Sequence, residues 1–208
     1  MSFLNSIKSA KFFTYPFHHW EIKDPLTNKM LTELSDAGVS SEPRAFDGTR
    51  ASDEGGGGLD SNYRVFIKRN NYNNFPELSK LIEELRSSQC ASFISALLKK
   101  DFKDAYVRIE VISDKPGFWL RPHTDIKEKL MSCLIFSSPN GESEDLGTDF
   151  YDERLKLVKT VNYRENYGYI FTQGKNTWHG LEKKKIINER RCLQVNYVTF
   201  ETNWKVVL

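Results

Sequence analysis

The sequence has few cysteines, no long apolar run and almost no charge imbalance, and each absence excludes a class of protein. Its three cysteines, Cys90, Cys133 and Cys192, are too few for a disulfide framework, so we expect a reducing, cytoplasmic environment. No apolar run approaches the roughly 20 residues of a membrane span, and no signal-peptide pattern begins the chain. The 30 basic and 28 acidic residues nearly cancel, so we expect neither a nucleic-acid nor a membrane partner.

What is present is the composition of an ordinary folded domain. The chain has 208 residues, of which 39% are hydrophobic and 28% are charged. This length suits one domain with a sizeable core. We therefore expect a single domain over residues 1–208, with a helical front segment over residues 1–104 and a strand-rich core over residues 105–200.

Apolar residues at helical spacing predict three helices in the front segment. The first is expected to begin at Asp24-Pro25, the second at Pro76 and the third near Phe93. Residues 44–60, between the first two, end with four consecutive glycines. Glycine has high chain entropy and no side chain to pack, which favours a mobile surface loop. The alternative is a lid that closes over a substrate.

From residue 105 onward, polar and apolar residues alternate as they do in β-strands. Short strands joined by Gly, Pro and Asn turns favour a sandwich or a barrel, with the front helices covering one outer sheet face. The expected strands are Tyr63–Ile67, Ala105–Ile112, Leu130–Phe136, Thr148–Tyr151, Arg154–Val161, Tyr167–Thr172 and Arg190–Phe200.

Two histidines and one aspartate form a candidate metal site. His123 and Asp125 are two residues apart, so in an extended strand both side chains point to the same side. His179 can join them only through the fold, for example on an adjacent antiparallel strand. Two imidazoles and one carboxylate leave one side of Fe(II) open, although zinc can use the same ligands. The other two histidines lie in the aromatic stretch YPFHHW, where a packing role is expected.

Arg190 and Arg191 begin the last strong strand and form a candidate anion site. Alternation puts Arg190, Cys192, Gln194 and Asn196 on one polar face, and Arg191 on the opposite, largely apolar face. Arg190 is therefore the better candidate to face a ligand cavity, where its guanidinium could bind a carboxylate through two hydrogen bonds. The alternative is that both arginines are solvated at the end of the strand.

Together these residues resemble the Fe(II)/2-oxoglutarate-dependent oxygenases, particularly the prolyl-4-hydroxylase-like group and its bacterial and phage relatives. The resemblance rests on PHTD, GTDFY, WHG and RRCLQVNYV, and it covers about residues 105–200. It implies a mainly β fold, a double-stranded β-helix or jelly roll, with the N-terminal helices packed on its outer sheet. It also implies that His123, Asp125 and His179 bind iron.

The resemblance implies further site residues. Arg190 would bind the distal carboxylate of 2-oxoglutarate, with Arg191 as the fallback, and Cys192 stands where many members have a serine. Phe136 stands near the place of a tyrosine that commonly supplies a second hydrogen bond, so that bond has no assigned donor. Candidate substrate-binding residues near the mouth of the site are Trp119, Arg121 and Arg64.

Three functions follow from this reading. The first is a dioxygenase that uses dioxygen and 2-oxoglutarate to hydroxylate a peptidyl or small-molecule substrate, releasing succinate and carbon dioxide, with no catalytic side chain beyond the metal ligands. Asp125 occupies the position that halogenating relatives leave empty, which disfavours halogenation. The second is a non-catalytic jelly-roll binding protein, which the complete set of ligands argues against. The third is a cupin-type zinc or iron enzyme that uses no keto acid.

Overall fold

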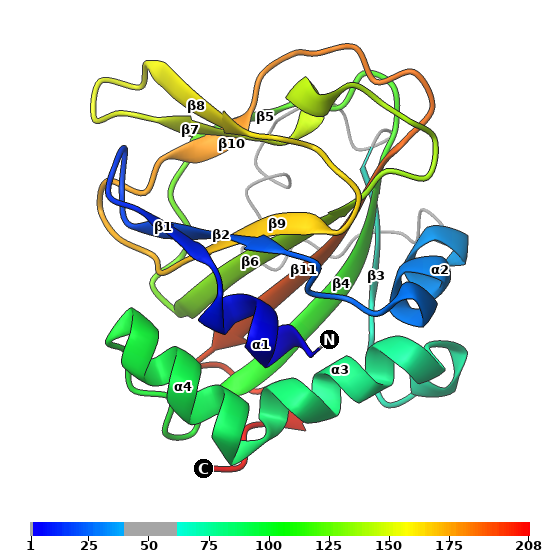
Figure 1. Ribbon diagram of the computed structural model, residues 1–208, viewed down its shortest axis with the longest axis vertical. Coiled ribbons are helices and arrows are strands. Elements are labelled where there is room, and N and C mark those ends of the chain that lie inside the picture. The colour runs from blue at the N-terminus through cyan, green and yellow to red at the C-terminus, as the bar shows by residue number, and fades with distance from the viewer. Residues whose placement is uncertain (1, 40–61) are drawn as a thin grey trace.

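The computed structural model describes residues 2–39 and 62–208, and in that part of the chain two antiparallel sheets face each other (Figure 1). The larger sheet has the order β1-β2-β9-β6-β11-β4-β12, with β3 also paired to β4, and the smaller has the order β5-β10-β7-β8. The larger sheet consists of β1 (Lys11–Phe13), β2 (His19–Lys23), β3 (Asn62–Phe66), β4 (Tyr106–Asp114), β6 (Lys129–Ser137), β9 (Tyr167–Phe171), β11 (Arg190–Val198) and β12 (Trp204–Lys205). The smaller consists of β5 (Leu120–His123), β7 (Thr148–Tyr151), β8 (Leu157–Val161) and β10 (His179–Leu181). The expected mainly β jelly roll is confirmed.

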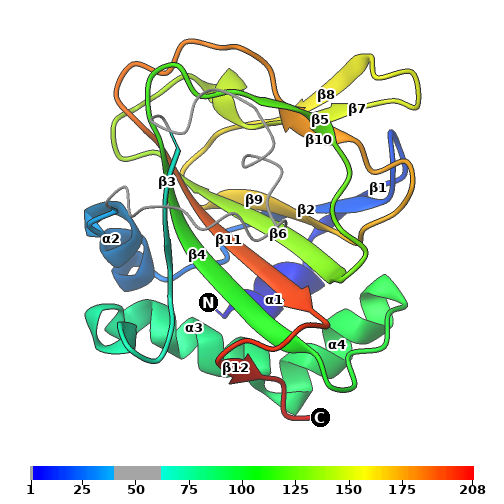
Figure 2. The same ribbon diagram turned by 180° about the vertical axis from the view of Figure 1, so that it is seen from behind.

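Helices cover the outer face of the larger sheet, as expected (Figures 1 and 2). They are α1 (Phe3–Lys8), α2 (Asn28–Asp36), α3 (Pro76–Arg86) and α4 (Ser88–Leu98), with short 3-10 turns at Tyr72–Asn74 and Glu144–Leu146. In α3, Leu78, Leu81, Ile82 and Leu85 recur at helical spacing and are fully buried. They join one apolar cluster with the outward-facing residues of β4, β6 and β11, so the helical stripe is what attaches α3 to the sheet.

The first helix begins later than the sequence suggests. The Thr27 hydroxyl accepts a hydrogen bond from the backbone N–H of Met30 and so caps a helix that starts at Asn28. Asp24 has a φ of 51°, which is outside the helical region, so Asp24-Pro25 forms a turn before the helix. The expected start at Asp24-Pro25 is therefore wrong.

Two other expectations need correction. Residues 154–156 do not extend β8, because Leu155 has a φ of 59° and its N–H bonds to the carbonyl of Asp152 in a turn. The helical front segment also contains strands, because β1 and β2 join the larger sheet in addition to β3, where a strand was expected. The glycine-rich segment 44–60, for which a loop and a lid were the alternatives, lies outside the described residues.

Side-chain alternation on β11 divides the molecule into two layers. Leu193, Val195 and Tyr197 point outward and pack under the helices, whereas Cys192 points inward to a second apolar cluster between the sheets. The inner face of the larger sheet also carries charged and polar side chains from β4, β6 and β11. The space between the sheets is therefore apolar at one end and polar at the other.

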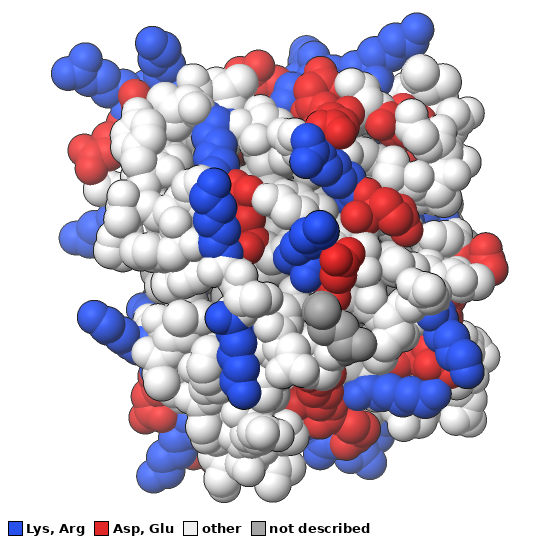
Figure 3. All heavy atoms as spheres, in the orientation of Figure 1, with Lys and Arg blue, Asp and Glu red and all other residues white. Residues whose placement is uncertain are grey.

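Charges of both signs are interspersed on the face shown in Figure 3. The view shows no broad patch of a single sign among the described residues. Within residues 2–39 and 62–208, no helix is long and apolar enough to cross a membrane.

Candidate metal and co-substrate site

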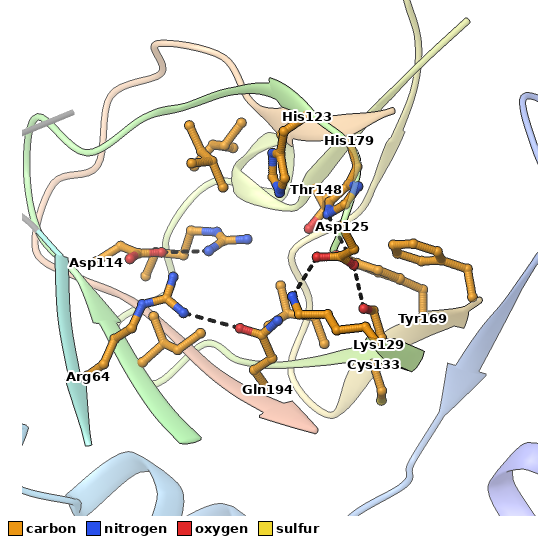
Figure 4. Close-up of a pocket in the computed structure, with 18 of the residues that line it drawn as sticks. Arg64, Asp114, His123, Asp125, Lys129, Cys133, Thr148, Tyr169, His179 and Gln194 are labelled. Atoms are coloured by element: carbon orange, nitrogen blue, oxygen red, sulfur yellow. Dashed lines mark hydrogen bonds and ion pairs between the residues drawn. The ribbon is translucent and has the colours of Figure 1, made fainter. Parts of the chain in front are cut away.

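The fold brings His123, Asp125 and His179 to one place. His123 is the last residue of β5, His179 is the first of β10, and the two are directly paired in the antiparallel register. Asp125 follows just beyond the end of β5. One donor atom from each side chain lies within 4.8 Å of the others, and Nε2 of His179 is 3.8 Å from Oδ2 of Asp125. Figure 4 shows the three side chains on the same side of the cavity.

Both imidazoles are held in the orientation that metal binding requires. Nδ1 of His123 is 3.0 Å from the carbonyl oxygen of Arg121, and Nδ1 of His179 is 2.9 Å from that of Thr177. Because a carbonyl only accepts, each Nδ1 carries the proton and each Nε2 presents a lone pair to the cavity. Burial lowers the pKa of His123 to about 3 and also lowers that of His179, so both rings are neutral at pH 7.

The Asp125 carboxylate is also fixed by its neighbours. The Lys129 ammonium donates to Oδ1 at 2.5 Å and the Ser132 hydroxyl donates to Oδ2 at 2.5 Å. Burial opposes the charged form, but the Lys129 charge and the two imidazoles outweigh it and hold the pKa of Asp125 well below its usual range. Asp125 and His179 are buried and His123 is half-buried, and the two hydrogen bonds keep the carboxylate ionised and oriented.

This donor set fits a divalent metal. Adjacent ligand atoms on one face of an octahedral ion lie about 3 Å apart when the bonds are about 2.1 Å long. The 3.8 Å between Nε2 of His179 and Oδ2 of Asp125 is therefore within about 1 Å of a bound geometry. Two neutral imidazoles and one ionised carboxylate would hold the ion on one side and leave its other side facing the cavity.

Arg190 lines the same cavity from the larger sheet. Its Nη1 donates to Oδ2 of Asp114 at 2.6 Å, and its Nε and Nη2 donate to the carbonyls of Leu146 and Gly147. The guanidinium also lies 5.5 Å from the centre of the Phe136 ring. Three of its five N–H groups are used in this way, and two remain for a ligand.

Arg191 points to the other face of β11, as side-chain alternation requires. Its Nη1 donates to the carbonyl of Ala37, just after α2, and its Nη2 lies 2.7 Å from Oε1 of Glu189. Cys192 is fully buried on the Arg190 side, and burial raises the pKa of its thiol to about 12. Of the two arginines, only Arg190 reaches the cavity that contains the histidines.

Two hydroxyl groups line the cavity where the sequence offered no assignment. Tyr169 on β9 and Thr148 on β7 both face it, and Phe136 lies beside Tyr169 with the ring centres 6.2 Å apart. Burial raises the pKa of Tyr169, so the phenol stays protonated and can donate a hydrogen bond. The Thr148 hydroxyl is also buried. The cavity therefore contains hydroxyl donors next to Phe136, whose own side chain cannot donate a hydrogen bond.

The expected mouth residues divide into two groups. Arg64 on β3 lines the cavity, where its Nη1 lies 3.2 Å from both Oε2 of Glu110 and Oε1 of Gln194. Trp119 and Arg121 do not line it, because Phe118 and Leu120 alternate with them and point inward instead.

Several cavity residues escaped sequence reasoning. They are Asp114, Lys129, Ser132, Thr148 and Tyr169. Alternation along β6 and β9 could have placed Ser132 and Tyr169 on an inward face, but no local signal connects either one to Asp125 or Arg190. The cavity contains about 690 Å³ of empty space, part of it open to solvent.

In comparisons of the sequence, neither a protein-family model nor a curated protein matches the chain. Solved structures do match. A prolyl-4-hydroxylase from Pseudomonas putida superposes with a TM-score of 0.58 at 12% identity, covering 95% of this chain and 97% of its own. A prolyl hydroxylase from Trichoplax adhaerens, in complex with a hypoxia inducible factor peptide fragment, gives 0.56 at 14% identity, covering 94% and 87%.

A third match is HygX from Streptomyces hygroscopicus, whose structure contains nickel and 2-oxoglutarate. It superposes with a TM-score of 0.57 at 12% identity, covering 89% of this chain and 85% of its own. At such identities the likeness establishes the fold. The chain therefore has the jelly-roll fold of prolyl hydroxylases, which confirms at the level of fold the resemblance that the sequence motifs indicated.

Proposed function

We propose that this protein is an Fe(II)- and 2-oxoglutarate-dependent dioxygenase that hydroxylates a small-molecule or peptidyl substrate. One observation carries the proposal: two imidazoles with fixed Nε2 lone pairs and one ionised carboxylate converge in a cavity whose wall carries Arg190. The likeness to HygX, whose structure contains nickel and 2-oxoglutarate, supports the same ligand pair. When bound, iron and 2-oxoglutarate would reduce dioxygen, placing one oxygen atom in succinate and the other in the hydroxylated product, with release of carbon dioxide.

The residues of this chain have separate roles in that chemistry. His123, Asp125 and His179 would hold the metal. Lys129 and Ser132 would orient the Asp125 carboxylate, since each donates to one of its oxygens.

Arg190 would bind the distal carboxylate of 2-oxoglutarate with its two remaining N–H groups, and the ion pair with Asp114 fixes the direction of the guanidinium. We assign the second hydrogen bond to the Tyr169 hydroxyl, because Tyr169 lines the same cavity as Arg190 and Asp125. The apolar side chains of Phe118, Leu120 and Phe171 would keep water from the reacting atoms.

One observation favours a second candidate, a jelly-roll metalloenzyme that uses no keto acid. Asp114 already balances the charge of Arg190, with Oδ2 and Nη1 2.6 Å apart. A protein of that kind would bind metal at the histidines but would not need Arg190 as a ligand. Co-substrate binding is therefore the measurement that separates the two functions.

Calorimetric titration can provide that separation. Metal-free protein would be titrated with Mn(II), and then with 2-oxoglutarate in the presence of Mn(II), because Mn(II) does not start turnover. We expect both to bind, and we expect Fe(II) in air to give slow succinate release. Binding of Mn(II) without any binding of 2-oxoglutarate would favour the second candidate.

Asp125→Ala tests the metal site. Its control is Asp36→Ala, because Asp36 is an exposed aspartate at the end of α2. Asp125→Ala should lose metal binding and succinate release, whereas Asp36→Ala should keep both. Tight metal binding in Asp125→Ala would show that the three side chains are not a metal site.

A further inference from the structure

The polar end of the space between the sheets contains buried groups that the proposed chemistry does not use. β4, β11 and β6 place Arg108, Asn196 and Ser132 in one row on the inner face, because Asn196 is paired in register with both of the others. Ser132 donates to the Asp125 carboxylate, so this row begins at the candidate metal site. With strands about 4.8 Å apart, the row leads about 10 Å across the sheet to Arg108.

Two members of this row lack hydrogen-bond partners although they are buried. Asn196 is 0% exposed, and neither Oδ1 nor Nδ2 has a partner. Arg108 is 6% exposed, and its Nε has no partner either. Each unsatisfied buried polar group costs stability, so such groups call for an explanation, and a ligand that completes them is one.

The surroundings of Arg108 define what that ligand is. Its Nη2 lies 3.3 Å from Oε1 of Glu110, but Arg64 lies 3.2 Å from the other oxygen of the same carboxylate. Glu110 therefore divides its charge between two guanidiniums. The Arg108 guanidinium also lies 5.0 Å from the centre of the Phe66 ring and 6.0 Å from that of Phe200, which fixes its plane. A fixed guanidinium with an unused Nε is suited to a carboxylate.

Arg108 also connects two cavities. It lines the cavity that contains the triad and a second one, with about 760 Å³ of empty space, bordered by Phe66, Phe200 and Trp204. Figure 4 shows that the triad lies across the first cavity from Arg64, with Gln194 on the floor between them. A molecule held at Arg108 would thus extend over Gln194 toward the metal.

We infer that the substrate is a small carboxylic acid, such as a free amino acid, whose carboxylate is bound by Arg108 and whose chain extends over Gln194 toward the metal. This inference rests on the proposed function, because it places the oxidised carbon at the metal, about 10 Å from Arg108. It selects a small acid over a peptidyl substrate, because the carboxylate of an internal peptide residue is replaced by an uncharged amide.

The experiment uses pairs of probes. Succinate release by the iron-loaded wild-type protein is measured with the 20 common free amino acids and short linear carboxylic acids, each compared with its primary amide. At least one acid should raise succinate release about tenfold or more while its amide does not. An amide as effective as its acid, or no acid that stimulates release, would overturn the inference.

Variants of Arg108 then test whether this residue binds the carboxylate of the stimulating acid. Arg108→Met should raise the half-saturating concentration of the stimulating acid about 30-fold or more, and Arg108→Lys should recover part of that loss because the charge returns without the planar fork. Arg86→Met, which removes a guanidinium from the outer end of α3, is the control and should match wild type. Equal effects of Arg108→Met on an acid and its amide would show that Arg108 does not bind the carboxylate.

These outcomes are separable from a failure of the proposed function. If wild type fails to bind Mn(II) or 2-oxoglutarate, the dioxygenase proposal itself fails. If it binds both but shows no preference for acids, only the substrate inference fails.

Discussion

Replacing Gly180 with alanine should weaken metal binding more than it weakens the fold. Gly180 follows His179 in β10, where the backbone passes close to β5. An added Cβ would lie 2.6 Å from the carbonyl oxygen of Leu120 and 3.0 Å from that of Arg121. Because real Cβ contacts are almost never shorter than 3.0 Å, β5 and β10 must separate by at least 0.4 Å. That displacement acts directly on the pair that brings His123 opposite His179.

The size of the effect follows from two tolerances. Overpacking of this kind costs about 1–3 kcal/mol of folding free energy, which lowers the melting temperature of a chain of this length by about 2–4 °C per kcal/mol. Metal–ligand distances tolerate only about 0.2 Å, so a displacement of the β5 backbone disturbs the site more than the sheet. The Arg121 carbonyl also fixes Nδ1 of His123, so its movement turns the ring. We expect the dissociation constant for Mn(II) to rise at least tenfold, about 1.4 kcal/mol.

The assay is Mn(II) titration by calorimetry, together with thermal unfolding in a chelator. Gly168→Ala is the matched control, because its Cβ would lie 2.1 Å from the carbonyl oxygen of Leu134 in the β6–β9 pair, which carries none of the three metal donors. Gly38→Ala, with nothing within 4 Å, controls for the substitution itself. Wild-type metal affinity in Gly180→Ala, or an equal loss in Gly168→Ala, would refute the reasoning.

Three further predictions concern the cavity wall and the loop before β11. Arg190→Met should raise the KM for 2-oxoglutarate about 30-fold or more, since a buried carboxylate loses its partner at about 2–5 kcal/mol, whereas Arg191→Met should leave KM unchanged; the reverse result in steady-state kinetics would contradict the observed direction of the two side chains. Tyr169→Phe should raise the same KM about tenfold without changing Mn(II) affinity, and an unchanged KM would remove Tyr169 from the co-substrate site. The Glu142 carboxylate accepts three backbone N–H bonds from residues 187–189, and these outweigh burial and lower its pKa. A group whose pKa is lower in the folded state adds stability above the unfolded pKa of about 4.5, and this contribution is lost as pH falls through the folded pKa. Urea unfolding should therefore show Glu142→Gln to be about 1–3 kcal/mol less stable at pH 7, with the difference shrinking below pH 4; a difference that is constant with pH would contradict the assignment.

The sequence determined the local elements and the identity of the candidate donors. Alternation from residue 105 onward predicted most strands, because side-chain direction in extended backbone depends only on adjacent residues. The same rule predicted that Arg190 and Arg191 point to opposite faces, which their contacts with Asp114 and Ala37 show. The two-residue spacing of His123 and Asp125 likewise put both donors within reach of one ion.

Only the tertiary structure decided how those donors meet and what surrounds them. The pairing of His123 with His179 joins segments far apart in sequence, and the register is set by burial of whole strands, which no local pattern encodes. The Lys129 and Ser132 bonds to Asp125 depend on the same long-range packing. The first helix illustrates the limit on a small scale, because local chemistry favoured a start at Asp24-Pro25, whereas Thr27 caps the helix. Asp24 does not cap the helix, since it continues from β2 into a turn where its N–H bonds to the carbonyl of Asn166.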